Sequence, residues 1–229
     1  MPLMKYSLTL IFVVAVNVLC FAQKFSTSIG GQLSIPQSDY KEVNPVAGYG
    51  LRANVLFRPG YRTPVKFGIE LGIQEKARAN QYFSGYVYGY YDDFQVNATS
   101  DIFSLMAVTR IQSSEPNLFK PFVDFTAGWN VFFSTVTVDE LGYYNYSPSY
   151  SNSSKANWAF ACGVTGGVDI SLNRRDALGL ELKVAYLLGS YANYLTDPYI
   201  DGSGNVSFLQ NSSRTNMVIP QAGIRITID

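Results

Sequence analysis

Eight segments of this chain alternate apolar and polar residues with a period of two, and no useful length of sequence shows the period of an amphipathic helix. Clusters of Gly, Pro, Asn and Ser separate the segments. Because side chains alternate across a strand, each segment predicts a β-strand with two unlike faces. The predicted strands span residues 24–35, 47–58, 65–75, 100–111, 120–134, 157–171, 177–189 and 217–228.

The two faces of these strands differ in bulk as well as polarity. In KPFVDFTAGWNVFFS, residues 120 to 134, Phe125 and Trp129 share one face, whereas Asp124 and Asn130 share the other. Glycines accompany the polar face throughout the chain. The charged residues on that face are Arg52, Lys66, Glu70, Arg110, Asp124, Asp169, Glu181, Lys183 and Arg225.

Volume decides which face points inward. Eight antiparallel strands close into a barrel whose interior is just wide enough to be filled by side chains, so the bulky apolar face would overfill it. Small residues and charges of opposite sign suit a narrow interior, where an isolated ion would be costly. We therefore expect the apolar face to point outward and the nine charged residues to form an internal network.

The connections between the strands alternate in length. Strands of 9 to 11 tilted residues cross a bilayer, and outer-membrane barrels combine short periplasmic turns with long extracellular loops. The sequence thus predicts an all-β, eight-stranded antiparallel transmembrane barrel. The short connections are residues 59–64, 113–120 and 173–176, and the long ones are 36–46, 76–99, 135–156 and 190–216.

The first residues indicate export. Lys5 precedes the apolar run LTLIFVVAVNVLCFA, which is shorter than a membrane-spanning helix and ends in small residues. We expect residues 1–22 to be a signal peptide cleaved after Ala22, and residues 23–229 to form one barrel domain integral to the outer membrane. With 17 basic and 17 acidic residues, the chain has no charge excess that would favour a nucleic-acid partner.

Three stretches carry a resemblance to a known family. KPFVDFTAGW, FACGVTGGVDISLNRRDALGLELKVAY and the closing AGIRITI resemble the small outer-membrane β-barrel proteins of Bacteroidota often called PorT-like. In architecture the chain is more distantly similar to OmpX and the OmpA barrel. The resemblance implies a location in the Gram-negative cell envelope and a fold, and it implies no reaction.

The residue types argue against catalysis. The chain has no histidine, the usual base in hydrolytic sites, and basic neighbours should keep the internal carboxylates ionised. DPYIDGSGN, residues 197 to 205, lacks the regular oxygen spacing of a calcium loop. We expect no enzyme activity, no cofactor and no metal site.

Tyrosines concentrate in two of the long connections. QYFSGYVYGYYDDF and LGYYNYSPSY mix tyrosine with glycine, serine and asparagine, a composition suited to molecular contacts. Alternatively, these tyrosines extend the strands beyond the membrane and pack on one another. The candidate contact residues are Tyr82, Tyr86, Tyr88, Tyr90, Tyr91, Tyr143, Tyr144 and Tyr146.

These observations favour a structural or interaction role in the outer membrane, for example as an accessory subunit of a larger complex. The expected partners are outer-membrane lipid, lipopolysaccharide and other outer-membrane proteins. A small porin-like channel is an alternative, although the bulky inward residues Leu56, Met106 and Phe132 would obstruct a pore. A secreted lipocalin-like binder is a weaker alternative, because it would need its apolar face inside.

Overall fold

The computed structural model describes residues 24–60, 63–87, 90–113, 117–140, 150–153, 156–173, 176–200 and 206–228. The predicted signal peptide and its cleavage site lie outside these ranges. The described elements are β1 (Lys24–Pro36), α2 (Asp39–Val43), β2 (Gly48–Arg58), β3 (Val65–Val87), β4 (Tyr90–Gln112), β5 (Phe119–Glu140), β6 (Tyr150–Ser153), β7 (Asn157–Ser171), β8 (Leu178–Gly189), β9 (Tyr191–Ile200), β10 (Val206–Arg214) and β11 (Met217–Ile228).

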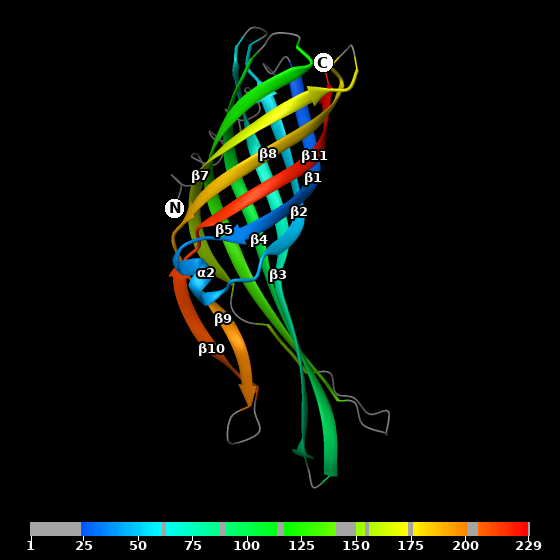
Figure 1. Cartoon of the computed structure of the whole chain (residues 1–229), viewed down its shortest axis with the longest axis vertical. Coiled ribbons are helices and arrows are strands. Elements are labelled where there is room, and N and C mark those ends of the chain that lie inside the picture. Colours follow the sequence, from blue (N-terminus) through cyan, green and yellow to red (C-terminus); the bar gives the residue numbers. More distant parts are fainter. Residues whose placement is uncertain are drawn as a thin grey trace, which may run out of the picture.

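Eight of these strands form a closed antiparallel barrel, which confirms the predicted fold class. The hydrogen-bonded order is β4, β3, β2, β1, β11, β8, β7 and β5, and pairing of β4 with β5 closes the ring. The first and last strands meet in register, with Phe25 opposite Ile228. Each of the eight predicted segments therefore supplies one strand of the wall (Figure 1).

The short and long connections lie at opposite ends of the barrel. The last residues of β2, β4 and β7 and the first residues of β3, β5 and β8 lie at one end of the barrel, and the C-terminus lies at that same end (Figure 1). The other end carries α2, the far ends of β3 and β4, and a separate hairpin of β9 and β10 (Figure 1). We call these the turn end and the loop end.

The predicted strand limits at the loop end were too short. The sequence predicts a connection over residues 76–99, but β3 and β4 stay paired as far as Val87 and Tyr90. Apolar alternation reports burial of one face, and such a signal is weak where strands project beyond a core. The predicted connections at 36–46, 135–156 and 190–216 contain α2, the end of β5 with β6, and the β9–β10 hairpin, respectively.

Exposure of the side chains separates the two faces as predicted. Ile69, Phe125 and Val184 on the apolar face are each at least 50% exposed. By contrast, Leu56 and Met106 point inward and are at most 1% exposed. The wall therefore turns its bulky apolar side chains outward. Among the described residues, no helix is both long enough and apolar enough to cross a membrane.

An apolar cluster fills the loop end of the interior. Its centre is Tyr40 of α2, which is 1% exposed and meets the ring of Phe132 edge-on at a centroid distance of 6.4 Å. Small residues of the wall leave room for these rings. The other buried members are Ile102, Met106, Ala159, Ala161, Ala185, Leu187, Ala192, Met217 and Ile219.

Candidate functional site

Charged side chains fill the interior between the apolar cluster and the turn end. The structure places all nine predicted network residues inside the barrel, where each is less than 10% exposed. Six of them form a chain of alternating sign that crosses the lumen from β2 to β5. In order along this chain they are Arg52, Glu70, Lys183, Glu181, Arg110 and Asp124.

Arg110 on β4 is the most enclosed cation of this chain. Its Nε and Nη2 donate to the two carboxylate oxygens of Asp124 at 2.7 and 2.8 Å. Its Nη1 donates to Glu181 on β8 at 2.5 Å, and its guanidinium carbon lies 3.7 Å from the ring centroid of Phe122. Two carboxylates and an aromatic face thus hold the planar guanidinium, an arrangement that lysine could not reproduce.

Glu70 on β3 links the other end of the chain across the lumen. Its two oxygens accept from Arg52 at 2.9 Å and from Lys183 at 2.6 Å. Lys183 also lies 3.2 Å from Glu181, which joins this group to Arg110. Strands β2, β3, β4, β5 and β8 are therefore tied together through their interior side chains as well as through backbone pairing.

Glycine makes room for the large interior cations. A Cβ added to Gly72 would lie 3.0 Å from Nε of Arg52. One added to Gly179 would lie 2.7 Å from both Nη2 of Arg225 and an oxygen of Asp169. At Gly72 and Gly179 the absence of a side chain thus leaves space for the interior guanidinium groups.

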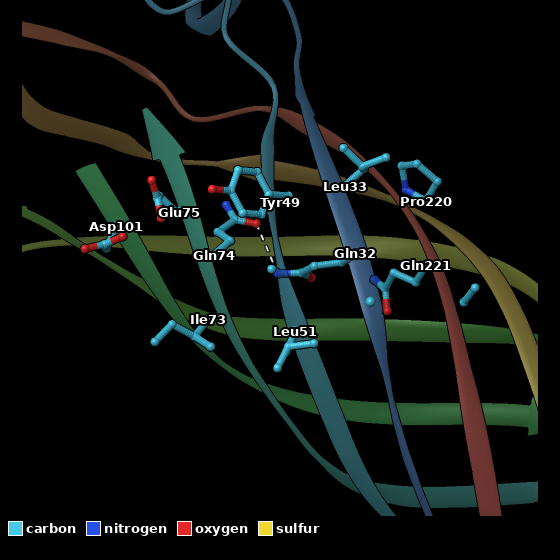
Figure 2. Close-up of a pocket in the computed structure, with 13 residues that line it drawn as sticks. Gln32, Leu33, Tyr49, Leu51, Ile73, Gln74, Glu75, Asp101, Pro220 and Gln221 are labelled. Atoms are coloured by element: carbon cyan, nitrogen blue, oxygen red, sulfur yellow. Dashed lines mark hydrogen bonds between the residues drawn. The ribbon is translucent and has the colours of Figure 1, made fainter. Parts of the chain in front are cut away.

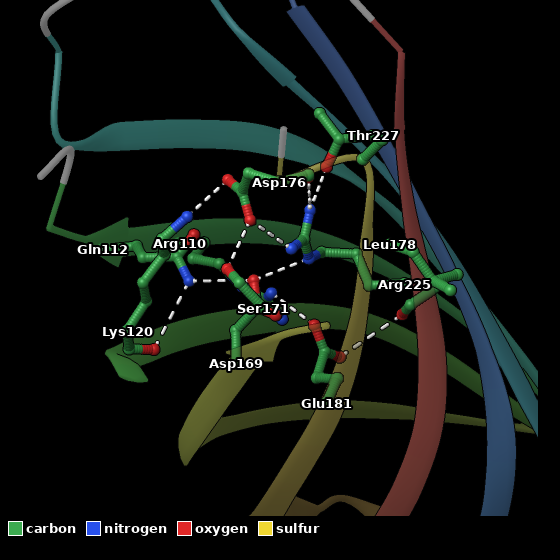
Figure 3. A network of polar contacts seen from close by, with 12 residues as sticks. Arg110, Gln112, Lys120, Asp169, Ser171, Asp176, Leu178, Glu181, Arg225 and Thr227 are labelled. Atoms are coloured by element: carbon green, nitrogen blue, oxygen red, sulfur yellow. Dashed lines mark hydrogen bonds and ion pairs between the residues drawn. The ribbon is translucent and has the colours of Figure 1, made fainter. Parts of the chain in front are cut away.

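A second group lies at the turn end (Figure 3). Arg225 on β11 contacts Asp169 on β7 at 2.6 Å and Asp176 in the β7–β8 turn at 2.7 Å. Asp176 also accepts from Ser171 at 2.6 Å and forms an ion pair with Lys120 of β5. The group links β5, β7 and β11 to the β7–β8 turn through side chains.

Sequence reasoning missed two members of this group. Lys120 lies four residues before Asp124 and shares its inward parity, so the alternation already contained the signal. Asp176 gives no such signal, because a turn residue has no strand face. Its φ of 56° is in the left-handed region that Asp and Asn tolerate better than other side chains.

Lys66 is held differently from the other interior cations. Its ammonium donates to the amide oxygen of Gln112 at 2.7 Å. The Gln112 amide nitrogen in turn approaches Asp169 at 3.4 Å. A neutral amide thus connects Lys66 to the turn-end group.

A row of glutamines separates the charged layer from the apolar cluster. Gln32 of β1 donates to Gln74 of β3 at 3.1 Å, passing Gly50 of the intervening strand β2. Gln74 in turn faces the sulfur of Met217 in the apolar cluster at 3.9 Å. The interior is therefore layered along the barrel axis from charged to amide to apolar.

Little free space remains beside the chain of ion pairs. A cavity of about 10 Å³ lies beside Arg52, Asn54 and Lys183, which is about the volume that one water molecule requires. The interior carboxylates are engaged by Arg and Lys. In the part of the chain that the structure describes, no group of three His, Cys, Asp or Glu residues is placed to hold a metal ion.

The predicted contact tyrosines lie at the loop end where the backbone is described. Tyr82 and Tyr86 belong to β3, Tyr90 and Tyr91 belong to β4, and Tyr86 is paired with Tyr91. The hairpin brings these four positions onto one projecting ribbon. Tyr88, Tyr143, Tyr144 and Tyr146 lie outside the described residues, as do Asp201 and Asn205 of the calcium-like stretch.

Asp176 supplies a pH-dependent prediction. Burial would raise the pKa of its carboxyl, but hydrogen bonds from Lys120 and Ser171 and the charge of Arg225 hold that pKa below its ordinary value. A lowered pKa in the folded state stabilises the fold at pH above the ordinary aspartate pKa of about 4, and this contribution is lost as pH falls through the folded-state pKa. We expect Asp176→Asn to lower the urea midpoint at pH 7 and to lower it much less at acid pH.

Asn keeps the left-handed backbone accessible, so the substitution removes the charge and one acceptor oxygen without straining the turn. The measurement compares the unfolding midpoints of the two proteins at pH 7 and near pH 2. An equal difference at both pH values would mean that the Asp176 charge does not stabilise the fold.

Comparison with known proteins gives structural likeness only. The chain matches no protein-family model and no curated protein. Neisserial surface protein A is 13% identical over 88% of this chain and 96% of its own, with a TM-score of 0.48. Ail of Yersinia pestis is 12% identical over 90% and 98%, with a TM-score of 0.42. A major outer membrane protein from Thermus thermophilus is 16% identical over 90% and 98%, with a TM-score of 0.45.

Proposed function

We propose that this chain is an integral outer-membrane β-barrel with a structural or interaction role. The outward face carries this proposal. Large apolar side chains on all eight barrel strands are substantially exposed, among them Leu71, Leu105, Trp129 and Ile226. A soluble monomer rarely exposes an apolar surface larger than a few hundred Å², whereas a lipid-facing wall requires one.

The closed interior supports an interaction role over a channel. The lumen contains the alternating ion-pair chain, the glutamine row and the cluster around Tyr40. Conduction requires a continuous wet path, which these side chains occupy. The outward direction of the apolar face likewise favours a membrane barrel over a lipocalin-like binder, whose apolar face lines a cavity.

The projecting strands offer the surface for such a role. Beyond Glu75, β3 pairs with β4 on one side, and among the described residues no strand pairs with its other side. From residue 79 to residue 87 this edge, ANQYFSGYV, contains no charge and no proline, the residues that commonly protect free edges. An extended segment of another outer-membrane protein could add to it as a strand.

We infer that the role is non-catalytic and that the partner is another protein of the cell envelope. The tyrosine-rich hairpin would then place the barrel as an accessory subunit in a larger assembly. The three stretches that resemble PorT-like proteins of Bacteroidota agree with this proposal.

Shortening the hairpin tests the interaction role. In this variant an Asn-Gly turn replaces residues 79–98, joining Arg78 to Thr99, which face each other in the ladder. The barrel wall keeps its pairing, so we expect unchanged membrane retention. We also expect the particle extracted from native membranes in mild detergent to shrink from an assembly to the single chain.

The size of the extracted particle is the readout, with the unmodified chain as control. If the unmodified chain already migrates alone, at 25.4 kDa or less plus its detergent, the accessory-subunit role is wrong. If the shortened chain stays in the larger particle, the partner binds elsewhere on the barrel.

A further inference from the structure

The turn end of the barrel carries more positive charge than its carboxylates balance. Deeper in the lumen, the ion-pair chain from Arg52 to Asp124 is neutral, with three cations and three carboxylates. The next layer toward the loop end is uncharged, because Gln32 there donates to Gln74 at 3.1 Å (Figure 2). The described charged residues of the turn end are Arg58, Lys66, Lys120, Arg225, Asp169 and Asp176. Among these described residues, two positive charges remain unbalanced.

Arg58 and Lys66 are the two cations in excess. Lys66 is 8% exposed, and its ammonium donates to the neutral amide of Gln112. The Nε atom of Arg58 is buried without a hydrogen-bond partner. In the part of the chain that the structure describes, neither side chain forms an ion pair. Burial of a cation without a counter-charge is costly, so an anion at this place would stabilise the barrel.

The carboxylates nearby are already engaged by other cations. Asp176 acts electrostatically on Arg58, but it is paired with Lys120 and Arg225. Asp169 acts on Lys66, but it is paired with Arg225. The excess of positive charge therefore persists after the internal ion pairs are formed.

The two cations lie side by side in one row of the wall. Phe57 of β2 is opposite Phe67 of β3, which places Arg58 beside Lys66, and Lys66 is in turn opposite Arg110 of β4. Arg110 is held by two carboxylates, as described above. Arg58 is the last residue of β2 and is half-buried, so this row reaches the rim of the turn end.

We propose that the turn end of the barrel binds one phosphate group, held by the guanidinium of Arg58 and the ammonium of Lys66. A guanidinium can donate two parallel hydrogen bonds to phosphate, and a lysine ammonium adds a compact charge with three donors. A phosphate monoester carries close to two negative charges at neutral pH. It therefore matches the two unbalanced cations in charge as well as in hydrogen bonding.

The phosphate belongs to a soluble molecule and not to a lipid headgroup. Arg58 shares the inward parity of Arg52, and Lys66 shares that of Glu70. Lipid lies against the opposite, outward face of the wall. Arrival of the ligand from the periplasm rests on the proposed outer-membrane location, because short turns face the periplasm in such barrels.

Equilibrium dialysis of radiolabelled inorganic phosphate tests the proposal. The purified, intact barrel is kept in an uncharged detergent at neutral pH, and sodium chloride holds the ionic strength constant. We expect saturable binding of one phosphate per barrel. Arg58→Gln and Lys66→Gln should each weaken this binding about tenfold or more, the factor that corresponds to one hydrogen bond to a charged group.

Lys41→Gln is the matched control. Lys41 is an exposed lysine of α2 at the loop end, so this variant should bind phosphate like the unmodified chain. Arg58→Gln and Lys66→Gln each remove a cation that lacks a counter-charge, and without phosphate their urea midpoints should equal or exceed that of the unmodified barrel. Added phosphate should raise the midpoint of the unmodified barrel and not those of the two variants.

Three results would overturn the proposal: no saturable binding of phosphate, undiminished binding in both Arg58→Gln and Lys66→Gln, or an equal loss in Lys41→Gln. Displacement of the label by phosphatidic acid in mixed micelles, and not by glycerol phosphate, would contradict a soluble ligand. The dialysis uses the isolated barrel, so its result does not depend on the membrane location. Release of the chain from native membranes by carbonate would refute that location separately.

Discussion

Replacing Arg110 by Met should lower the free energy of unfolding by about 3–5 kcal/mol, the effect typical of breaking a buried ion pair on one side. Arg110 supplies both hydrogen bonds to the carboxylate of Asp124, which is 2% exposed. Without the guanidinium, that carboxylate remains in the interior with no opposite charge in contact. Urea unfolding of the barrel in lipid vesicles measures the change.

Two further variants test whether the unpaired Asp124 carboxylate causes this loss of stability. Arg214→Met changes an exposed arginine whose guanidinium lies 5.6 Å from the ring of Tyr191, and it should alter stability by no more than about 0.5 kcal/mol. Adding Asp124→Leu to Arg110→Met removes the stranded carboxylate and should restore part of the loss. If Arg110→Met and the unmodified barrel had equal free energies of unfolding, the internal network would not be what stabilises the barrel interior.

The second large effect concerns the outer wall. Val184→Arg should destabilise the barrel in a bilayer by about 2–4 kcal/mol, the cost of a cation on the lipid face near the midplane. Val184 lies near the middle of β8, is 52% exposed, and is flanked by Gly166 and Pro220 on the neighbouring strands. The longer side chain therefore meets little steric obstruction from the wall.

Val46→Arg is the control for this substitution. Val46 is 51% exposed, but it lies in the connection between α2 and β2, beyond the barrel wall. We expect Val46→Arg to change the free energy of unfolding in a bilayer by no more than about 0.5 kcal/mol. If Val184→Arg destabilised the barrel no more than Val46→Arg does, the exposed apolar face would be in contact with water and not with lipid.

The barrel strands could be predicted from sequence because each has one bulky face and one small, polar face. The prediction for β8, residues 177–189, differs from Leu178–Gly189 by one residue. The same parity distinguished inward Asp124 from outward Phe125. Alternation of apolar and polar residues shows which side chains point inward wherever the two faces of a strand have different surroundings. It can be recognised without knowing which strand is the neighbour.

The sequence could not identify which interior charges pair. Parity assigns a side chain to a face but does not give its height in the barrel or its neighbour across the lumen. Glu70 contacts Lys183 from a strand 113 residues later in the chain, and that contact depends on the stagger of all the intervening strands. Ion-pair partners therefore required the three-dimensional structure.

Tyr40 also lay beyond the reach of sequence reasoning. It belongs to a five-residue helix, too short to show a helical period, inside a segment whose composition indicated a connection. Its burial depends on the space left by Ala159, Ala161 and Ala185 of the wall. Tyr40 is thus positioned by tertiary packing and not by a local signal.

The most direct test of the account uses Cys162, the only cysteine after the predicted signal peptide. Cys162 is exposed on β7, between inward-facing Ala161 and Gly163 in the chain. A spin label attached to Cys162 in bilayer vesicles reports collisions with oxygen, which concentrates in lipid, and with a water-soluble nickel complex. A lipid-facing barrel predicts frequent collisions with oxygen and few with nickel. Frequent collisions with nickel would place this face in water and contradict the membrane-spanning barrel.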